Sequence, residues 1–599
     1  MTRSSKLASP PLLLAGSAVL ALSLALGCST GAIGDDVQAG GSPGVPPVPA
    51  SGASSAGGPS AGSGSSAGGP PSATCDGNVV SDNKRVVRLS FNQISRTIHA
   101  LLGDTFGSKV DVEYELGAES STARTFPPLS SPQEGSTITT GIWQKVDLIA
   151  ATAGSYTLAN LNQVTGCGAT PTDACAQTFV QGFAEKAYRR PLTATESASI
   201  LQVYSEVKTI YGTIPEAVQH SMYAIMQSPE LLYRTEIGET KDQTGPLAPY
   251  ELASSLSYFL SDGPPDAELL AAARDKKLAS PADIAAQVDR ILVTPTARKN
   301  LEGAIFSYFQ VDNLATVKID DPAFTSGTQA KPFTGVRESA YREVELFLAN
   351  TLWSGQLTNI LTTKKSWVNT TLAKIYNVTL PGQTDETQFV ETELPANRGG
   401  LLTQVGFLAS NSRPDVPSVV ARGLVVNKAM LCQTNPPFPT DPALVAAIEE
   451  AGTKLASVSE RERAAYRAAT SPCSGCHHTF DAYGLALDTY DSIGRYRTMD
   501  PEGRPIDPSV TLPALFDNEI ATDTIVMQNK IAANPGFTAC FSKNMLNWAM
   551  AEGSQLTPTS CATQAIVSGF DKSDKSLSSL LREVAISKAF THRNAGGTL

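Results

Sequence analysis

The pattern of apolar positions after residue 85 is mainly helical. The first predicted helix carries apolar residues at intervals of three and four, namely Phe91, Ile94, Ile98 and Leu101. This spacing places them on one face of a helix. Ser90 stands where an N-cap is expected and Gly103 where a helix stops. The sequence therefore predicts a helix between Ser90 and Gly103.

Similar patterns recur along the chain, and they indicate a mostly α protein. Thr193 and Glu196 have the spacing of a capping box that opens a helix. Other helices are predicted around the apolar positions Phe179 and Phe183, at Leu231, Leu232 and Tyr233, at Leu252, Leu256 and Phe259, over 335–352 and over 541–552. Strand-like alternation is sparse, with short candidates at 107–113 and 388–393. We expect several small helical modules in tandem.

The first residues predict export. Arg3 and Lys6 precede an uncharged Leu/Ala-rich stretch over 11–26, which is too short and wrongly flanked for a membrane-spanning helix. The stretch leads through Leu and Gly to Cys28, which resembles the lipidated cysteine of a bacterial lipobox. We expect a signal peptide over 1–27 and a lipid anchor on Cys28. An ordinary cleaved signal peptide with an incidental cysteine is the alternative.

Residues 28–74 are expected to form a disordered tether. From residue 31 this stretch is almost wholly Gly, Ser, Ala and Pro, and Ser-Ser-Ala-Gly-Gly-Pro occurs at 54–59 and again at 65–70. Such a composition buries too little apolar surface to offset its ordering entropy. A flexible chain of this length reaches roughly 35–40 Å. The tether would hold a globular body away from a membrane.

Composition narrows the class of partner. The 599 residues are enough for several packed cores. The 57 acidic and 46 basic residues give a formal net charge of -11, and no basic run occurs. Nucleic-acid binding is therefore not expected, because it requires a basic face. After Cys28 no apolar run approaches the ~20 residues that span a bilayer, so the body is expected to be soluble.

The cysteines fit an oxidising compartment. Cys167 and Cys175 flank a short turn and are candidates for a local disulfide. Cys540 and Cys561 are candidates for a bridge between two C-terminal helices, which leaves Cys75 and Cys432 to pair across the chain. Spacing alone does not establish this connectivity.

One motif carries clear chemistry, the sequence Cys473-Ser474-Gly475-Cys476-His477. With nine Cys and five His in the chain, chance supplies a C-x-x-C-H about 0.001 times. Two thiols three positions apart on a helical turn can add to the vinyl groups of one haem, and the following His can ligate the iron. The motif therefore predicts covalent haem c, which agrees with the predicted export.

Three alternatives to haem remain open for Cys473 and Cys476. They are a disulfide or redox pair, a zinc site with His477 or His478, and a structural motif without haem. The expected βαβ context of a redox pair and a second Cys/His pair for zinc are missing from the sequence.

Three further residues are candidates for the haem site. Met527 follows the motif at the most cytochrome-like spacing and is the candidate distal ligand, although an ordinary core or surface methionine is the alternative. Without a distal methionine the iron would be five-coordinate, which favours catalysis over electron relay. Arg495 and Arg497 are candidates to pair with haem propionates, or else to form surface ion pairs.

The residues around the motif carry a family resemblance. Pro472 to His477, Asp481 to Leu487 and Tyr490 to Arg497 resemble the signature of large multi-domain proteins of unknown function in planctomycetes and myxobacteria. The modules of this family are planctomycete-specific and often stand beside cytochrome-like domains. Further matches lie at Arg88–Asp104, Ala187–Thr193, Ser228–Arg234, Leu256–Asp266, Arg398–Thr403 and Arg422–Cys432. Asp488 stands where the family usually has Glu, and the family pattern fixes no distal methionine.

The resemblance implies an architecture rather than a reaction, because the family has no established activity. We expect helical modules over 80–150, 175–236 and 245–378, a cytochrome-c-like module with the CxxCH motif over 395–505, and a C-terminal helical module over 515–597.

Two functions are consistent with these features. The leading hypothesis is a lipid-anchored haem protein in the envelope of a Gram-negative bacterium, at the outer membrane or in the periplasm, which exchanges electrons with a redox partner or performs haem-dependent oxidation. The alternative is a non-enzymatic surface lipoprotein that binds polysaccharide or protein, with Cys473 and Cys476 as a disulfide.

The remaining titratable residues give no clear indication of a further functional site. His99 is expected on a helix surface. The acidic pairs Asp262 with Asp266 and Glu343 with Glu345 have nothing in the sequence to distinguish them from solvated charges.

Overall fold

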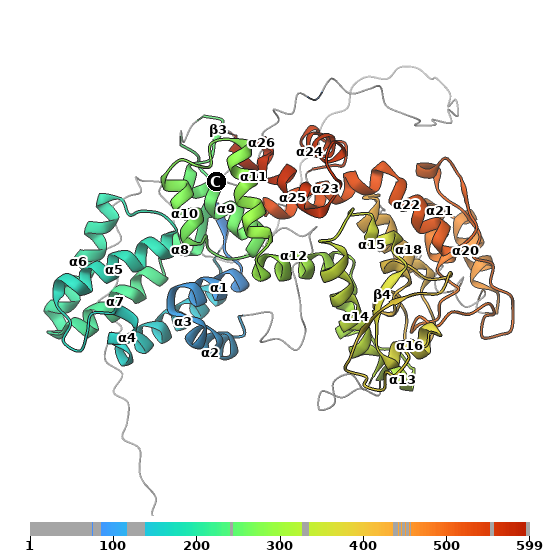
Figure 1. The fold of residues 1–599 in the computed structure, drawn as a ribbon, viewed down its shortest axis with the longest axis horizontal. Coiled ribbons are helices and arrows are strands. Elements are labelled where there is room, and N and C mark those ends of the chain that lie inside the picture. Colours follow the sequence, from blue (N-terminus) through green and yellow to red (C-terminus); the bar gives the residue numbers. More distant parts are fainter. Residues whose placement is uncertain are drawn as a thin grey trace, which may run out of the picture. The chain divides into compact units, whose positions relative to one another are not determined.

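The computed structural model describes much of the chain after residue 74 (Figure 1). The described residues are 75, 86–116, 138–239, 243–325, 335–434, 441–442, 445, 450, 455, 457–471, 473–551 and 556–594. The predicted signal peptide, Cys28 and the predicted tether lie outside them.

The prediction of a mostly helical protein is confirmed. The strands of the described part are short and pair in antiparallel two-stranded ladders. β1 (Val86–Arg88) pairs with β2 (Tyr233–Thr235), and β3 (Gly245–Pro246) pairs with β8 (His592–Arg593). The other two pairs are β4 (Lys365–Val368) with β5 (Val390–Glu393), and β6 (Val510–Thr511) with β7 (Ile520–Ala521).

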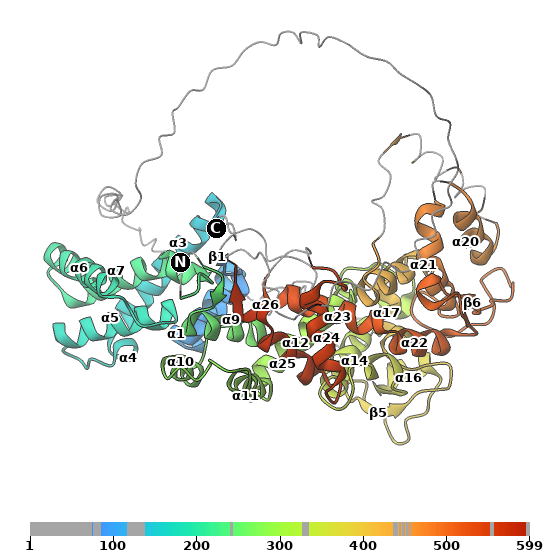
Figure 2. The same ribbon diagram turned by 90° about the horizontal axis from the view of Figure 1, so that it is seen from above.

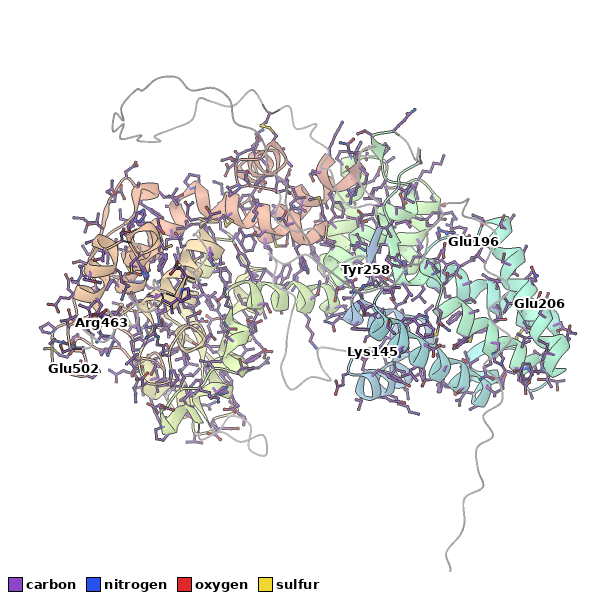
Figure 3. The ribbon with its side chains drawn as sticks, turned by 180° about the vertical axis from the view of Figure 1, so that it is seen from behind. Lys145, Glu196, Glu206, Tyr258, Arg463 and Glu502 are labelled. Carbon is purple, nitrogen blue, oxygen red and sulfur yellow. A yellow bond between two sulfur atoms is a disulfide. The ribbon has the colours of Figure 1, made fainter. Side chains whose placement is uncertain are left out.

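The first core is formed by helices that precede residue 233. They are α1 (Phe91–Leu102), α2 (Asp104–Tyr114), α3 (Thr140–Ala159), α4 (Leu161–Thr165), α5 (Asp173–Tyr188), α6 (Ala194–Tyr211), α7 (Ile214–Met226) and α8 (Pro229–Leu232). The Ser90 side chain caps α1 and exchanges hydrogen bonds with Gln93, and Thr193 caps α6 with Glu196. Both predicted helix starts are therefore confirmed. Tyr258 (Figure 3) belongs to α9 but is buried in this core.

The second core is larger and joins three of the predicted modules. Its first helices are α9 (Pro249–Ser261), α10 (Ala267–Arg274), α11 (Pro281–Leu292) and α12 (Pro295–Tyr308). The same core includes the C-terminal helices α22 (Thr524–Ala533), α23 (Pro535–Ala549), α24 (Cys561–Asp571), α25 (Leu577–Ile586) and α26 (Lys588–Thr591), of which α23 packs against α9 and α25 against α11. Figure 2 shows α23 and α25 beside α9, α11 and α12. The apolar cluster runs from Leu247 to Phe590, so these modules share buried surface.

A third, smaller core surrounds α14 (Val336–Thr351) and the β4–β5 pair. The neighbouring short elements are η1 (Val311–Ala315), α13 (Pro322–Thr325), α15 (Asn359–Thr362), α16 (Thr370–Tyr376), η2 (Leu401–Thr403) and α17 (Val405–Ser410). The chain continues through α18 (Val419–Val425), η3 (Val426–Met430), α20 (Glu460–Ala469), α21 (Ser474–Ala486) and η4 (Ala514–Phe516).

Two local predictions need correction. Residues 107–113, expected as a strand, lie in α2, because Phe106 and Val110 are buried four positions apart on one helical face. The helix at Pro229 ends at Leu232, because Tyr233 pairs with Arg88 in the β1–β2 ladder. The strand candidate at 388–393 is confirmed by β5.

Disulfides join cysteines that lie near and far in sequence. Cys167 pairs with Cys175, as expected. The other expected pairs are wrong, because Cys75 pairs with Cys561 and Cys432 pairs with Cys540. The physical reason is packing: η3 and α23 contact each other, which brings Cys432, two residues after the end of η3, beside α23. This contact joins segments 108 residues apart, a separation that sequence spacing does not reveal.

Candidate functional site

The CxxCH residues open α21, which packs against both α18 and α20. Two glycines allow the close approach of α18 and α21. A Cβ atom on Gly484 would lie 1.9 Å from the carbonyl oxygen of Val419, and one on Gly423 would lie 2.3 Å from the carbonyl oxygen of Phe480. Side chains at these positions would therefore push the helices apart.

The two thiols and the imidazole belong to one helical turn. The backbone N–H groups of Cys476 and His477 donate to the carbonyl oxygen of Cys473, at 3.1 and 3.0 Å. Cys473, Cys476 and His477 therefore stand at positions i, i+3 and i+4, which share one face of a helix. Both thiols are free and half-buried, whereas every other cysteine in the described part of the chain is in a disulfide.

A buried carboxylate orients the imidazole. His477 Nδ1 lies 2.9 Å from Asp481 Oδ1, one turn further along α21. Arg467 Nε donates to Asp481 Oδ2 at 2.8 Å, and its Nη2 donates to Glu460 Oε1 at 2.8 Å. The Asp481 side chain is only 4% exposed, compared with 19% for His477. Since Nδ1 faces Asp481, Nε2 is the ring nitrogen available to a ligand.

This donor set fits a c-type haem. A porphyrin supplies four of the iron ligands, so the protein needs to add one nitrogen and two thiols for the thioether bonds. Cys473, Cys476 and the Nε2 atom of His477 supply those groups from one face. Within the part of the chain that the structure describes, no group of three or more His, Cys, Asp or Glu side chains is placed to hold a metal ion by itself.

Comparison with protein families places this site in a known domain. Residues 175–236 match PSD5, residues 247–378 match PSD4, and residues 398–500 match PSCyt3, each described as a protein of unknown function (DUF1595, DUF1592 and DUF1588). The chain therefore contains three domains of unknown function, which is consistent with a multi-domain family of unknown function. Searches of curated proteins and of solved structures found no match. The CxxCH motif lies within the PSCyt3 domain.

A buried arginine fixes the chain that follows α21 in the PSCyt3 domain. The Arg422 guanidinium donates to the carbonyl oxygens of Leu487, Tyr490 and Asp491, at 2.9, 2.7 and 2.7 Å. Burial lowers the pKa of Arg422 to about 10. The sequence offered this residue only as part of a family motif, and burial of an arginine has no signal in apolar periodicity.

Arg398, at the start of the PSCyt3 domain, also donates hydrogen bonds to backbone carbonyl oxygens. Its guanidinium donates to the carbonyl oxygen of Thr403 at 2.9 Å and to that of Gly494 at 2.5 Å. It lies over the rings of Tyr376 and Tyr490, at 4.5 and 5.0 Å from their centres. Arg398 therefore holds the Gly494 turn against the third core.

The two arginines considered for haem propionates are paired within the protein. Arg495 lies 2.6 Å from Asp491 and 2.8 Å from Asp321. Arg497 lies 2.9 Å from Asp488 and also donates to the Asp488 backbone. Ion pairing with carboxylates, the alternative interpretation of these residues, is the arrangement in the structure.

Met527, the candidate distal ligand, lies in α22 and is completely buried in the second core. His477 is instead half-buried at the start of α21. The two side chains therefore occupy different environments, one enclosed by apolar groups and the other partly open to solvent.

Among the helices that the structure describes, none is both long enough and apolar enough to cross a membrane.

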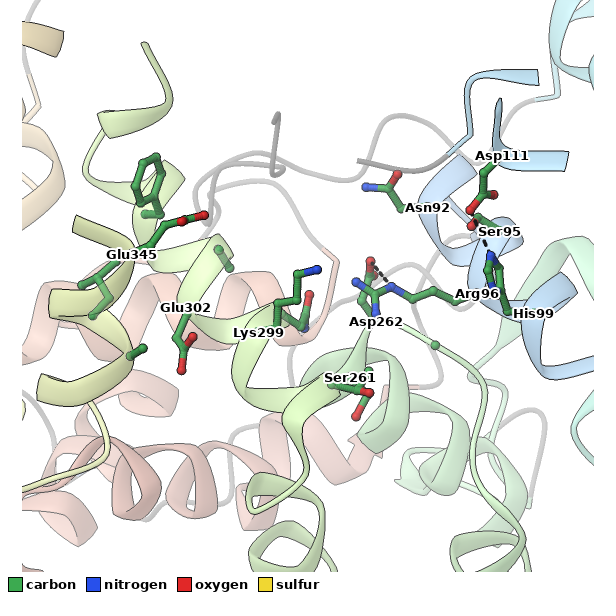
Figure 4. Close-up of a pocket in the computed structure, with 18 of the residues that line it drawn as sticks. Asn92, Ser95, Arg96, His99, Asp111, Ser261, Asp262, Lys299, Glu302 and Glu345 are labelled. Carbon is green, nitrogen blue, oxygen red and sulfur yellow. Dashed lines mark hydrogen bonds and ion pairs between the residues drawn. The ribbon is translucent and has the colours of Figure 1, made fainter. Parts of the chain in front are cut away.

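A second candidate site is a polar cleft of about 960 Å³ (Figure 4). Figure 4 shows Arg96 and His99 on α1, Lys299 and Glu302 on α12, and Asp262 between them. The cleft therefore presents both carboxylates and cations on separate helices.

One residue of the cleft, Asp262, differs from its expected environment. Asp262 is buried rather than solvated, and burial raises its pKa to about 6, although Gln93 donates to it at 2.8 Å and Arg96 lies 3.6 Å away. His99 is half-buried, with its ring nitrogens 2.9 and 3.0 Å from Asp104 and Asp111. Burial lowers the pKa of His99, but these two hydrogen bonds outweigh it and raise the pKa above 6.5.

Of the two acidic pairs noted in the sequence, neither forms a catalytic pair in the structure. Asp266 caps α10 and pairs with Arg290 at 2.7 Å, while Glu345 pairs with Arg342 at 3.0 Å. Glu343 is completely buried, so the expectation of a solvated charge is wrong there. Glu343 is buried and Glu345 is not, because Glu343 lies on the face of α14 that packs into the third core.

Proposed function

We propose that the PSCyt3 domain attaches one haem covalently through Cys473 and Cys476, with His477 Nε2 as the proximal iron ligand. The observation that carries the proposal is one helical face with two free thiols beside an oriented imidazole. It is supported by the contrast with the other described cysteines, all of which are oxidised. A compartment that favours disulfides is also the one where export would deliver the chain.

The haem would supply one-electron chemistry to the protein. The chain would contribute two thioether bonds and one imidazole ligand, while Gly423 and Gly484 keep α18 and α21 close. Met527 is enclosed in the second core, and we propose His477 as the protein ligand of the iron. A haem held in this way would suit oxidation of an external substrate better than simple electron relay. A redox partner protein remains necessary to supply or remove electrons.

We also propose that the protein is anchored by lipid in the cell envelope. Cys28 would carry the lipid anchor after removal of residues 1–27, and residues 28–74 would separate the globular part from the membrane of a Gram-negative envelope. Labelling with a radioactive or azide-bearing fatty acid tests this part: Cys28→Ser abolishes incorporation if the anchor is correct. Lipid labelling that persists in the variant contradicts it.

A visible spectrum tests the haem. The protein is expressed with cytochrome c maturation machinery, and a reduced-minus-oxidised spectrum and a pyridine haemochrome assay are recorded. We expect one covalent haem per chain. Cys476→Ser is expected to lose at least one thioether bond, and His477→Ala to lose attachment.

His478→Ala is the matched control, because His478 is exposed and its Nδ1 bonds to the backbone of Ser474. That variant should keep the haem. A colourless wild-type protein that is folded, with a Cys473–Cys476 disulfide found by peptide mapping, would instead favour the binding-protein alternative.

The polar cleft is the observation that favours the second candidate function, binding of a polysaccharide. Sugar hydroxyl groups pair with carboxylates, amides and guanidinium groups, and the cleft carries several of these. Pull-down on a panel of insoluble glycans tests it, with Lys299→Ala as the variant. Equal retention of wild type and variant, or no retention at all, contradicts a glycan site in this cleft.

A further inference from the structure

The hydrogen-bond acceptor for His477 Nδ1 is a charged side chain, although a neutral acceptor would be enough to orient the ring. A neutral backbone carbonyl can accept a hydrogen bond from Nδ1 and fix the ring. Here the acceptor is the carboxylate of Asp481, 2.9 Å from Nδ1 and almost completely buried. Such a carboxylate adds negative charge to the imidazole as well as fixing its tautomer.

The Asp481 carboxylate is fixed in turn by a hydrogen bond from Arg467. Arg467 Nε donates to the other oxygen of Asp481 at 2.8 Å, and Arg467 also bonds to Glu460. The Arg467 side chain is 18% exposed and that of Glu460 is 24% exposed, so these two charged groups are only partly open to solvent. His478, the next histidine, is exposed and turns its Nδ1 to the Ser474 backbone. Of the two neighbouring histidines, only His477 therefore pairs with Asp481.

From this arrangement we infer that Asp481 is a positioning residue that keeps the proton of His477 on Nδ1, presents Nε2 to the iron, and lowers the reduction potential of the haem. The inference rests on the proposed haem attachment. An imidazole hydrogen-bonded to a carboxylate is a stronger electron donor than one bonded to a carbonyl. A stronger donor stabilises ferric over ferrous iron, and second-shell hydrogen bonding is an established means of setting haem potential.

The reduction potential distinguishes the two functions open to the haem, which are electron relay and oxidation of an external substrate. A high potential suits an electron relay, whereas a low potential with a strongly donating imidazole suits oxidative chemistry. The His477–Asp481 contact therefore assigns the domain to the second function.

Spectroelectrochemical titration of the haem-loaded protein tests the inference. Asp481→Asn keeps the size of the side chain and a carbonyl acceptor for Nδ1 but removes the charge. We expect the reduction equilibrium to shift toward ferrous iron by about tenfold, which corresponds to about 59 mV for one electron. The iron–histidine stretching frequency in resonance Raman spectra of the ferrous protein should fall with it.

A second variant guards against misfolding. The amide nitrogen of Asp481→Asn would face the donating Arg467, so Asp481→Asn with Arg467→Gln restores a donor–acceptor pair. This double variant should be folded, with its three disulfides intact. It should show a rise in potential smaller than that of Asp481→Asn alone, because loss of the Arg467 cation acts in the opposite direction. The matched control is Asp507→Asn, an exposed aspartate whose Oδ1 accepts hydrogen bonds from Ser509. Its potential should equal that of the wild type.

The outcomes separate the two claims. A wild-type protein without covalent haem overturns the proposed function and, with it, the assignment of Asp481. A haem-loaded protein whose potential and iron–histidine frequency are unchanged in both Asp481 variants overturns the assignment alone. A raised potential in both variants, with haem content equal to the wild type, supports it.

Discussion

Glu236 and Arg593 form an ion pair that is completely buried, although 357 residues separate them in the sequence. Arg593 also donates to the carbonyl oxygens of Ala589, Phe590 and His592. Glu236 accepts a further hydrogen bond from Ser255 at 2.7 Å. The pair therefore fastens the C-terminal strand β8 to the segment that joins the first two cores.

Breaking this pair should destabilise the protein strongly. Glu236→Gln leaves the charges of Arg593 and of the neighbouring buried Arg234 uncompensated in the interior, and loss of one partner of a buried pair costs about 3–5 kcal/mol. The midpoint of urea unfolding should fall accordingly. Glu206→Gln is the control, since Glu206 is exposed on α6. Replacing both partners, Glu236→Gln with Arg593→Met, should cost less than Glu236→Gln alone, and a larger loss would contradict the charge explanation.

The sequence predicted local structure well and distant contacts poorly. The capped starts of α1 and α6 follow from residues three positions apart, so a short window contains all the information. The pairing of Glu236 with Arg593 depends on the folding of everything between them. The Cys540–Cys561 prediction failed for the same reason, because it chose cysteines close in sequence over those that packing brings together.

In the candidate site, too, local features could be predicted from the sequence and distant contacts could not. Cys473, Cys476 and His477 are recognisable by their spacing alone. The role of Asp481 follows from the i+4 spacing to His477 only after the helix and the ring orientation are known. Burial of Arg422 and Arg398 had no sequence signal, because charged residues are normally exposed.

Peptide mapping under non-reducing conditions should recover Cys75–Cys561 and Cys432–Cys540 linked peptides. Removal of the second bridge by Cys432→Ser with Cys540→Ser should lower stability by about 2–5 kcal/mol, because it releases a long loop in the unfolded chain. The same double substitution at Cys167 and Cys175, which close a loop of sequence separation 8, should cost less. Recovery of a Cys540–Cys561 peptide would contradict the described packing.

Gly484→Ala should disturb the haem helix. Its added methyl group would lie 1.9 Å from the backbone oxygen of Val419, and backbone gives way less easily than a side chain. We expect a loss of about 1–3 kcal/mol in stability and a lower ratio of haem to protein. Gly182→Ala on α5 is the matched control, because nothing lies within 4 Å of its added methyl group. That change should be neutral or stabilise the helix by about 0.5–1 kcal/mol.

Glu343 should make stability depend on pH. Its carboxyl accepts hydrogen bonds from Ser366 and Tyr376, both at 2.6 Å, and burial raises its pKa from 4.5 to about 7 despite the nearby positive charge of Arg398. Between these two values the folded state holds a proton that the unfolded state has released. The stability contributed by this group is therefore fully present below pH 4.5 and is lost as the pH rises toward 7.

A comparison with Glu343→Gln isolates this effect, because the amide stays neutral at every pH and all other groups titrate equally in both proteins. The free energy of unfolding of the wild type should fall by about 3 kcal/mol relative to the variant between pH 4.5 and pH 8. Chemical denaturation at several pH values measures the difference. A constant difference across this range would mean that Glu343 keeps its ordinary pKa, and that the hydrogen bonds from Ser366 and Tyr376 offset the cost of burying its charge.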